Sequence, residues 1–472
     1  MKKPIQSKTL HLLIGPALFL LIVVFPIGGM EFPVRVALGT IAWISWWFVT
    51  QPVPQGVTGL LPVAINAVLN VLPMNTVIAC YSAELLFLVA NANIITMTWE
   101  RTGVDKRIAA KILSLLGPNV KVQIAVWFTV ATLLSSVLPN IVVVVMLCSI
   151  SYSMLKFVGI SDMGTSKAAT TLMLAIIWGA EHGGMGTPLG GAMCQVITSH
   201  LEELLGGEFF YIDWVIRILP FFLALYVIGM IVMLVPKYDR IKFAESKEAI
   251  QATIKDLPPM RRSEWVSLLL FVVPTILAFT RPLWQELVPG MKPAYCFTVA
   301  GLLSFFIRQE DGEPLMTFKY ATDNLVWGIL FLIAGADAMG NMITNSGADV
   351  VIAGIINSFA QNDLLLIFVL VALTVIVEEV ACSTAAASIF MPIVIAVCAT
   401  TDLPVYGVIF ITTAAVNSAF AMPVSSRAVP LGYGVKTSDM FRQGLPGTIL
   451  SIFVITGLGY LLLKFWPMFS IL

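Results

Sequence analysis

The chain has 472 residues, of which 58% are hydrophobic and only 11% are charged, and its formal net charge at pH 7 is zero. Soluble domains average about 25% charged residues, so this chain lacks the polar side chains that a water-exposed surface needs. With a mean hydropathy of +0.92, the composition excludes a soluble globular protein. The zero net charge also argues against a nucleic-acid partner. What remains is an all-α polytopic membrane protein in contact with the lipid bilayer.

The first predicted element is an apolar run over residues 10–27, which follows Lys2, Lys3 and Lys8. No small-residue cleavage site comes after it, so we expect a retained transmembrane helix and not a signal peptide. Further apolar runs recur to the end of the chain, at 36–49, 85–98, 122–134, 141–155, 170–180, 219–235, 265–280, 326–343, 364–377, 407–420 and 449–463. Several are shorter than the ~20 residues of a full span.

Four segments interrupt the apolar pattern with Gly, Pro and small polar residues, at 135–141, 183–191, 378–384 and 422–432. Irregular backbone at membrane depth is tolerated only where it lines a cavity or is covered by protein. We therefore predict re-entrant hairpins near 122–141 and 364–384, and broken helices near 183–191 and 422–432. Free N–H groups at such breaks favour anions, while unwound carbonyl and hydroxyl oxygens favour small cations. The alternative is ordinary small-residue helix packing.

The most polar stretch, residues 237–264, carries seven Lys or Arg residues. By the positive-inside rule it is a cytoplasmic linker, on the same side as the N-terminus and as Arg101, Lys106, Arg107 and Lys111. The C-terminus, with little positive charge, is expected on the periplasmic side of a bacterial inner (plasma) membrane.

Residues on the two sides of the linker repeat. LFLVANAN at 86–93 and TGVD at 102–105 recur as LFLIAGAD at 330–337 and SGAD at 346–349, each 244 residues later. This predicts a first membrane repeat over 1–236 and a second over 265–472. Because the termini are expected on opposite sides, the two repeats should be inverted, as in many secondary transporters.

The segments 97–113, 324–347, 418–434 and 439–450 together resemble the divalent anion:sodium symporter family of dicarboxylate, citrate and sulfate carriers. The resemblance implies a scaffold domain and a transport domain that moves as a body, an elevator-type arrangement, and a homodimer. It also implies Ser-Asn-Thr motifs at the hairpin tips, which are altered here to Pro139-Asn140-Ile141 and Cys382-Ser383-Thr384. The chain is therefore a divergent member by this reading.

Carried over residue by residue, the resemblance implies two sets of ligands. The cargo set is Asn140, Ile141, Gly191, Ala192, Ser383, Thr384, Ser426 and Arg427, to which we add the hydroxyl-bearing Thr187 of the second interrupted segment. The first sodium site maps to Ser135, Pro139, Asn140 and Gly190, and the second to Glu378, Ala381, Ser383 and Ser425. The side chains of Pro139 and Ile141 cannot coordinate a ligand.

Two charged positions leave alternatives open. Arg427 either grips an anionic cargo with its guanidinium group or forms a structural ion pair with Glu378 or Glu379. Glu378 stands where a hydroxyl is usual in the family, so it binds a cation, pairs with Arg427 or carries a proton. The coupling ion is accordingly sodium or a proton, or the protein is an exchanger without one.

Other polar residues receive simpler interpretations. Glu181 and His182 are expected to be a loop pair at the membrane edge, although the histidine could titrate near neutral pH. Asn93 and Asp337, at matching repeat positions, are expected to pair across helices. The six cysteines show no metal-ligand spacing and are expected to be small core residues.

The sequence thus predicts a secondary active transporter for a small organic anion, such as a carboxylate. An inorganic oxyanion permease or an ion antiporter of related fold is the alternative. A membrane-embedded hydrolase is remote, because no nucleophile elbow is present. We expect no enzyme activity and no organic cofactor.

Overall fold

A computed structural model describes residues 4–25, 29–105, 107–108, 111, 119–157, 159–236, 238, 259–359 and 362–471. Within these residues the secondary structure is helical and contains no β-strand, as the composition predicts. Six of the described helical segments are long and apolar enough to cross a membrane: Phe32–Thr50, Met74–Thr102, Tyr211–Leu234, Arg262–Phe279, Trp327–Ser346 and Thr437–Phe465. The protein is therefore a multi-pass membrane protein.

The part of the chain before the predicted linker forms twelve described elements. They are α1 (Pro4–Val24), α2 (Phe32–Thr50), α3 (Gln55–Thr58), α4 (Leu61–Leu69), α5 (Met74–Cys80), α6 (Glu84–Thr102), α8 (Val120–Ser135), α9 (Asn140–Phe157), the 3-10 turn η1 (Met163–Thr165), α10 (Lys167–Gly184), α11 (Ala192–Leu205) and α12 (Tyr211–Leu234).

The part after the linker also forms twelve described elements. They are α14 (Arg262–Phe279), α15 (Arg281–Trp284), α16 (Pro293–Phe306), α17 (Phe318–Asn324), α18 (Trp327–Ser346), α19 (Ala348–Phe359), α20 (Asp363–Val380), α21 (Ser383–Ala399), α22 (Val405–Ala415), the 3-10 helix η2 (Ser425–Tyr433), α23 (Thr437–Phe465) and α24 (Pro467–Ser470).

Each of the four interrupted segments contains or follows a break between helices. The turn 136–139 separates α8 from α9, and residues 381–382 separate α20 from α21, so each pair forms a helical hairpin. Residues 185–191 lie between α10 and α11. The fourth break starts at Val416, earlier than the sequence suggested, and the chain continues as a 3-10 helix from Ser425.

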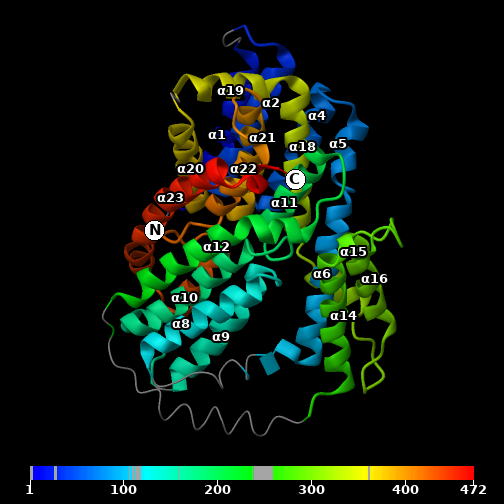
Figure 1. Cartoon of the computed structure of the whole chain (residues 1–472), viewed down its shortest axis with the longest axis vertical. Coiled ribbons are helices and arrows are strands. Elements are labelled where there is room, and N and C mark those ends of the chain that lie inside the picture. Colours follow the sequence, from blue (N-terminus) through cyan, green and yellow to red (C-terminus); the bar gives the residue numbers. More distant parts are fainter. Residues whose placement is uncertain are drawn as a thin grey trace.

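The helices gather into groups that bring these breaks together. The hairpin α8–α9 packs against α10, and α6, α14 and α16 pack on one another as a separate bundle (Figure 1). In the second part α21 packs against α11, α18, α19 and α22, and η2 contacts α9 and α10. Elements from both parts of the chain therefore meet around the hairpin tips.

Most of the predicted linker, residues 237 and 239–258, lies outside the described residues, as do Lys2, Lys3 and Lys106. Its described end leads into α14, which begins at Arg262, three residues before the predicted boundary. The Arg261 N–H donates to the Glu264 carboxylate at 2.7 Å, and this contact starts the helix. Arg107 forms an ion pair of 2.9 Å with Glu264, so the end of α6 lies beside the end of the linker.

The repeated segments end in the same way. The helices α6 and α18, which carry LFLVANAN and LFLIAGAD, both stop at a glycine in the left-handed region, Gly103 with φ 90° and Gly347 with φ 77°. Glycine adopts this conformation at no steric cost and is the usual residue at a helix end. The division into two inverted repeats stays a prediction.

Candidate functional site

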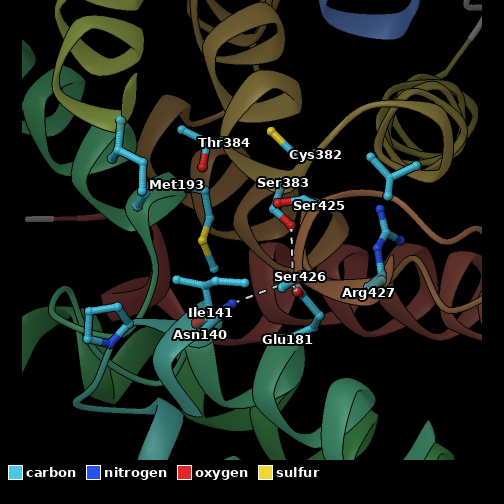
Figure 2. Close-up of a pocket in the computed structure, with 14 residues that line it drawn as sticks. Asn140, Ile141, Glu181, Met193, Cys382, Ser383, Thr384, Ser425, Ser426 and Arg427 are labelled. Carbon is cyan, nitrogen blue, oxygen red and sulfur yellow. Dashed lines mark hydrogen bonds between the residues drawn. The ribbon is translucent and has the colours of Figure 1, made fainter. Parts of the chain in front are cut away.

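Three of the four interrupted segments, 135–141, 378–384 and 422–432, line one cavity (Figure 2). Both hairpin tips, the start of α11, the start of η2, one residue of α10 and one of α18 contribute to it. The lining residues are Pro139, Asn140, Ile141, Glu181, Ala192, Met193, Ile329, Cys382, Ser383, Thr384, Val424, Ser425, Ser426 and Arg427. Segments nearly 290 residues apart in the sequence thus form one site.

Three α-helices begin at this cavity. The first residues of α9, α11 and α21 are Asn140, Ala192 and Ser383, and all three residues line it. The first N–H groups of a helix have no partner within the helix, and the helix dipole places partial positive charge at that end. Three converging N-termini make the cavity wall favourable for an anion.

The opposite helix ends bring oxygen atoms together beside the cavity. A Cβ atom on Gly190 would come within 2.6 Å of the carbonyl oxygens of both Ser135, the last residue of α8, and Gly184, the last of α10. The Ser135 hydroxyl donates to Asn140 Oδ1 at 2.9 Å. Carbonyl, hydroxyl and amide oxygens of this kind are the ligands that a small hard cation prefers.

Glu181 connects the separate segments of the site. This α10 carboxylate is 3% exposed, and it accepts hydrogen bonds from the Ser383 hydroxyl at 3.3 Å and, more weakly, from the Asn140 amide at 3.5 Å. Its other oxygen accepts from the Ser426 hydroxyl. A single buried carboxylate thus contacts both hairpin tips and the start of η2 (Figure 2).

Two neighbouring carboxylates hold the broken backbone after α22. Glu378 accepts from the N–H groups of residues 418 and 419 at 3.0 and 2.9 Å. Glu379 accepts from the N–H groups of residues 420, 421 and 422 at 2.8–3.2 Å. Five successive N–H groups are thereby satisfied at a place where no helix can satisfy them. The pair keeps the unwound segment in one conformation.

Arg427 binds backbone carbonyl oxygens of the same region. The side chain is 1% exposed, and its guanidinium group donates to the carbonyl oxygens of Ala419 at 2.9 Å, Glu378 at 2.7 Å and Ala381 at 3.3 Å. It also lies 3.7 Å from the carboxylate of Glu379. Of the two roles that the sequence left open, this geometry corresponds to the structural one.

Comparison with known proteins decides the family. A family model described as citrate transporter matches residues 45–416. The chain belongs to the citrate transporter family. It is 24% identical over 471 residues to the sodium-dependent dicarboxylate transporter SdcS of Staphylococcus saprophyticus, covering 96% of this chain and 90% of that protein. It is 26% identical over 471 residues to the sodium-dependent high-affinity dicarboxylate transporter 3 of Caenorhabditis elegans, covering 89% and 82%.

A solved structure supports the fold of the transporter. The YdaH transporter of Alcanivorax borkumensis matches with a TM-score of 0.55 at 12% identity, over 83% of this chain and 88% of that one. The predicted resemblance to the divalent anion:sodium symporters and the prediction of a transporter instead of an enzyme are confirmed.

The structure places most of the predicted cargo residues of the transporter around the cavity, but Thr187 and Gly191 are not among the lining residues. The Thr187 hydroxyl donates to the Ser136 carbonyl and accepts from the Leu189 N–H at 3.2 Å, so it closes a turn behind the site. Gly191 precedes α11 as its N-cap. Both residues therefore shape the break without facing the cavity.

The predicted cation residues fall into two groups. Ser135 and Asn140 belong to the oxygen cluster described above and Gly190 packs against it, whereas Pro139 only lines the cavity. In the second group, the carbonyl oxygens of Glu378 and Ala381 are bonded to Arg427. Ser383 and Ser425 line the cavity, and Ser425 has a left-handed backbone with φ 55°.

The interpretation of Glu181 and His182 as a loop pair at the membrane edge is wrong. Both lie on α10 and are buried, because the helix continues to Gly184. The His182 ring packs against Phe222 and Phe128, with centroid distances of 4.5 and 6.2 Å. The signal for Glu181 was available, since an ionisable residue that follows a long apolar run is by default a functional candidate in a membrane protein.

The expected pairing of Asn93 with Asp337 is also not what the structure shows. Asn93 donates to the Val89 carbonyl of its own helix at 3.0 Å, and Asp337 accepts from the Ser199 hydroxyl at 3.0 Å. The six cysteines are buried and form no disulfide, as core residues would, although Cys382 also lines the cavity.

Proposed function

We propose that this transporter moves a small organic anion with at least one carboxylate group across the plasma membrane, coupled to a cation. The observation that carries the proposal is the convergence of the N-termini of α9, α11 and α21 on one cavity. The names of the two relatives, both sodium-dependent dicarboxylate transporters, agree with this cargo class.

In this proposal the cargo carboxylate is held by neutral donors. Asn140, Thr384 and Ser426 offer an amide and two hydroxyls from three segments that the cavity brings together. The first N–H groups of the three helices add to them. Arg427 also lines the cavity, but its guanidinium group is hydrogen-bonded to backbone carbonyls, so in this proposal it contributes positive potential and no direct contact.

The same geometry supports one metal-cation site in place of two. The oxygen cluster of Ser135, Asn140 and Gly184 is suited to one small cation such as sodium. At the second position the Arg427 guanidinium group takes the carbonyl oxygens of Glu378 and Ala381. A permanent positive charge of the protein would thus stand in for the second ion.

Rigid-body movement of the two hairpins and the broken helices past the remaining helices would expose the cavity alternately on the two sides. The cytoplasmic N-terminus, the periplasmic C-terminus and the homodimer belong to this proposal as well. Cysteine accessibility at residues near each end, measured on intact and permeabilised cells, tests the orientation.

The cargo class is tested with purified protein. Thermal-shift measurements with mono-, di- and tricarboxylates, sulfonates and oxyanions, each with sodium or choline, report binding because a ligand stabilises the state that it binds. Counterflow in proteoliposomes then tests transport of each hit. Stabilisation by an inorganic oxyanion and by no carboxylate would contradict the proposal.

A matched pair of variants tests whether the cargo binds in the cavity. Thr384→Val removes a hydroxyl from the cavity wall, and we expect carboxylate affinity to fall about tenfold, corresponding to roughly one lost hydrogen bond. Thr412→Val is the control, because its hydroxyl donates to the Val408 carbonyl within α22, away from the cavity. Equal affinities of the two variants would exclude Thr384 as a cargo contact.

A further inference from the structure

A second cavity lies at the end of α12 that precedes the predicted cytoplasmic linker. It is formed by η1, the start of α10, the end of α12 and the first half of α23. Its volume is about 850 Å³, which is in the range of sites for small molecules. The described residues that line it are all different from those of the cargo cavity, so it is a separate site.

One part of this second cavity is positively charged. Lys167 is the first residue of α10, and Lys436 and Arg442 come from the N-cap and the second turn of α23. All three are exposed, and no described residue forms an ion pair with them. Asp439 is the only carboxylate among the described lining residues, so their formal charge is +2. The cavity therefore favours an anion.

Two long helices also begin beside these cations. The helix α10 has 18 residues and α23 has 29, and the first N–H groups of each carry partial positive charge. The Ser166 hydroxyl caps α10 by accepting from the Ala169 N–H at 3.2 Å. The N-cap residue of α23 is Lys436, whose side chain has no acceptor atom. A bound anion would supply an acceptor at this helix end.

The other part of the wall is apolar. Ile231 and Val235 are four residues apart at the end of α12 and are 50% and 72% exposed, and Leu450 of α23 is 40% exposed. Along α23 the lining changes from Arg442 through Pro446 to Leu450, that is, from charged to apolar. Both helices are long and apolar enough to span the membrane. The cavity thus has the order of polarity that a lipid has between its headgroup and its acyl chain.

This wall fits an amphiphile better than a soluble anion. Inorganic phosphate could contact the cations, but it would leave the apolar side chains uncovered. A zwitterionic lipid would bring a positive headgroup charge close to three cations. An anionic phospholipid matches both parts of the wall, and basic pockets between transmembrane helices at the cytoplasmic surface are suited to such headgroups.

We propose that the cavity between α10, α12 and α23 binds one anionic phospholipid, with the phosphate among the three cations and an acyl chain along the apolar wall. The lipid would connect helices from both parts of the chain. Gln443, which lines the cavity, already joins α23 to α10 by accepting from the Thr171 hydroxyl at 2.7 Å. A lipid phosphate adds a second connection, so binding should stabilise the fold.

Binding is tested with the full chain, purified in detergent and freed of lipid. Dioleoylphosphatidylglycerol and dioleoylphosphatidylcholine, which have the same acyl chains, are titrated separately, and binding is followed by native mass spectrometry and by the unfolding temperature. We expect phosphatidylglycerol to bind at least about tenfold more tightly, because each Lys or Arg near a headgroup strengthens binding roughly fivefold. Equal affinities for the two lipids would overturn the inference.

A matched pair of double variants locates the lipid. Lys436→Gln/Arg442→Gln removes two cations from the cavity and should weaken phosphatidylglycerol binding about 25-fold, with each single variant giving about fivefold. Arg308→Gln/Lys319→Gln removes the same charge at exposed positions outside the cavity and should keep the wild-type affinity. Equal phosphatidylglycerol affinities of the two double variants would contradict the site. The single variants give the same test if a double variant does not fold.

Inorganic phosphate separates the lipid from a soluble anion. At millimolar concentration it should not raise the unfolding temperature of the wild-type protein. Stabilisation by phosphate that matches that by phosphatidylglycerol, and that Lys436→Gln/Arg442→Gln abolishes, would assign the cavity to a soluble anion and overturn the lipid site. All of these measurements are made without cargo, so their outcome leaves the proposed function untouched.

Discussion

The Arg427 guanidinium group lies 3.7 Å from the carboxylate of Glu379, and both groups hold the same short piece of unwound backbone. Glu379 accepts N–H groups of residues 420–422, while Arg427 donates to the carbonyl oxygen of Ala419. The carboxylate of Glu379 thus satisfies the N–H groups of this unwound segment, and the guanidinium group of Arg427 satisfies a carbonyl oxygen of the same segment. The pair acts as a clamp on the fourth break.

This relationship predicts that Arg427→Gln destabilises the protein. Removing one partner of a buried ion pair costs about 3–5 kcal/mol, because the other charge and several carbonyl oxygens are left without partners. We expect a marked loss of thermal stability in detergent, measured by the unfolding of the purified protein. Arg308→Gln, an exposed position, should change the free energy of unfolding by less than about 0.5 kcal/mol.

The same experiment distinguishes the two roles of Arg427. If Arg427→Gln unfolds at the wild-type temperature but no longer binds carboxylates, the guanidinium group contacts the cargo and the clamp is not its function. Loss of stability with residual carboxylate binding agrees with the structure.

Glu379→Gln should also destabilise the fourth break. The amide keeps one acceptor oxygen but presents an NH2 group to a row of backbone N–H donors, so at least one buried N–H group loses its partner at a cost of about 1–3 kcal/mol. The Thr448 hydroxyl, 2.6 Å from the carboxylate, is affected as well. Glu286→Gln, at an exposed position, is the control for unfolding measurements. Equal stability of the two variants would show that the contacts of Glu379 with the three N–H groups of residues 420–422 contribute nothing.

Close packing of α8 on α10 depends on Gly183. A Cβ atom there would come within 2.2 Å of the Thr132 carbonyl oxygen. Because this oxygen belongs to the backbone, no side-chain rotation can relieve the clash. We expect Gly183→Ala to cost about 1–3 kcal/mol through overpacking. Gly457→Ala, in α23 with open space around the new methyl group, should instead stabilise the helix by roughly 0.5–1 kcal/mol. Opposite shifts in the unfolding temperature of the two variants check the prediction.

The breaks in the helices were predictable because their causes are local. Pro139, Gly186 and Pro423 stand in apolar sequence where a helix cannot continue or is weakened, and such residues are visible without a structure. The fourth break starts at Val416, before any such residue. Its start depends on Glu378 and Glu379, which take up the N–H groups and lie about forty residues away in the chain, so no local pattern reveals it.

The site was predictable only in part, for a similar reason. Ile141 and Ala192 were identified through the family resemblance, since nothing in their own chemistry indicates a binding role, and both line the cavity. The role of Arg427 depends on which oxygens surround it, and these come from distant segments. Glu181 was missed because the glycines that follow it suggest a loop, whereas α10 continues far enough to place the carboxylate in the cavity.

The last prediction concerns the oxygen cluster beside Gly190. Because a Cβ atom at this position would lie 2.6 Å from two carbonyl oxygens, Gly190→Ala must push Ser135 and Gly184 apart. We expect the sodium concentration that gives half-maximal thermal stabilisation to rise at least about tenfold, which corresponds to roughly 1.4 kcal/mol of binding energy. Gly432→Ala, with open space around it in η2, should keep the wild-type sodium titration. A displacement of the Ser135 and Gly184 carbonyl oxygens would change the coordination geometry of a cation bound between them. A wild-type sodium titration in Gly190→Ala would therefore place any bound sodium ion elsewhere in the transporter.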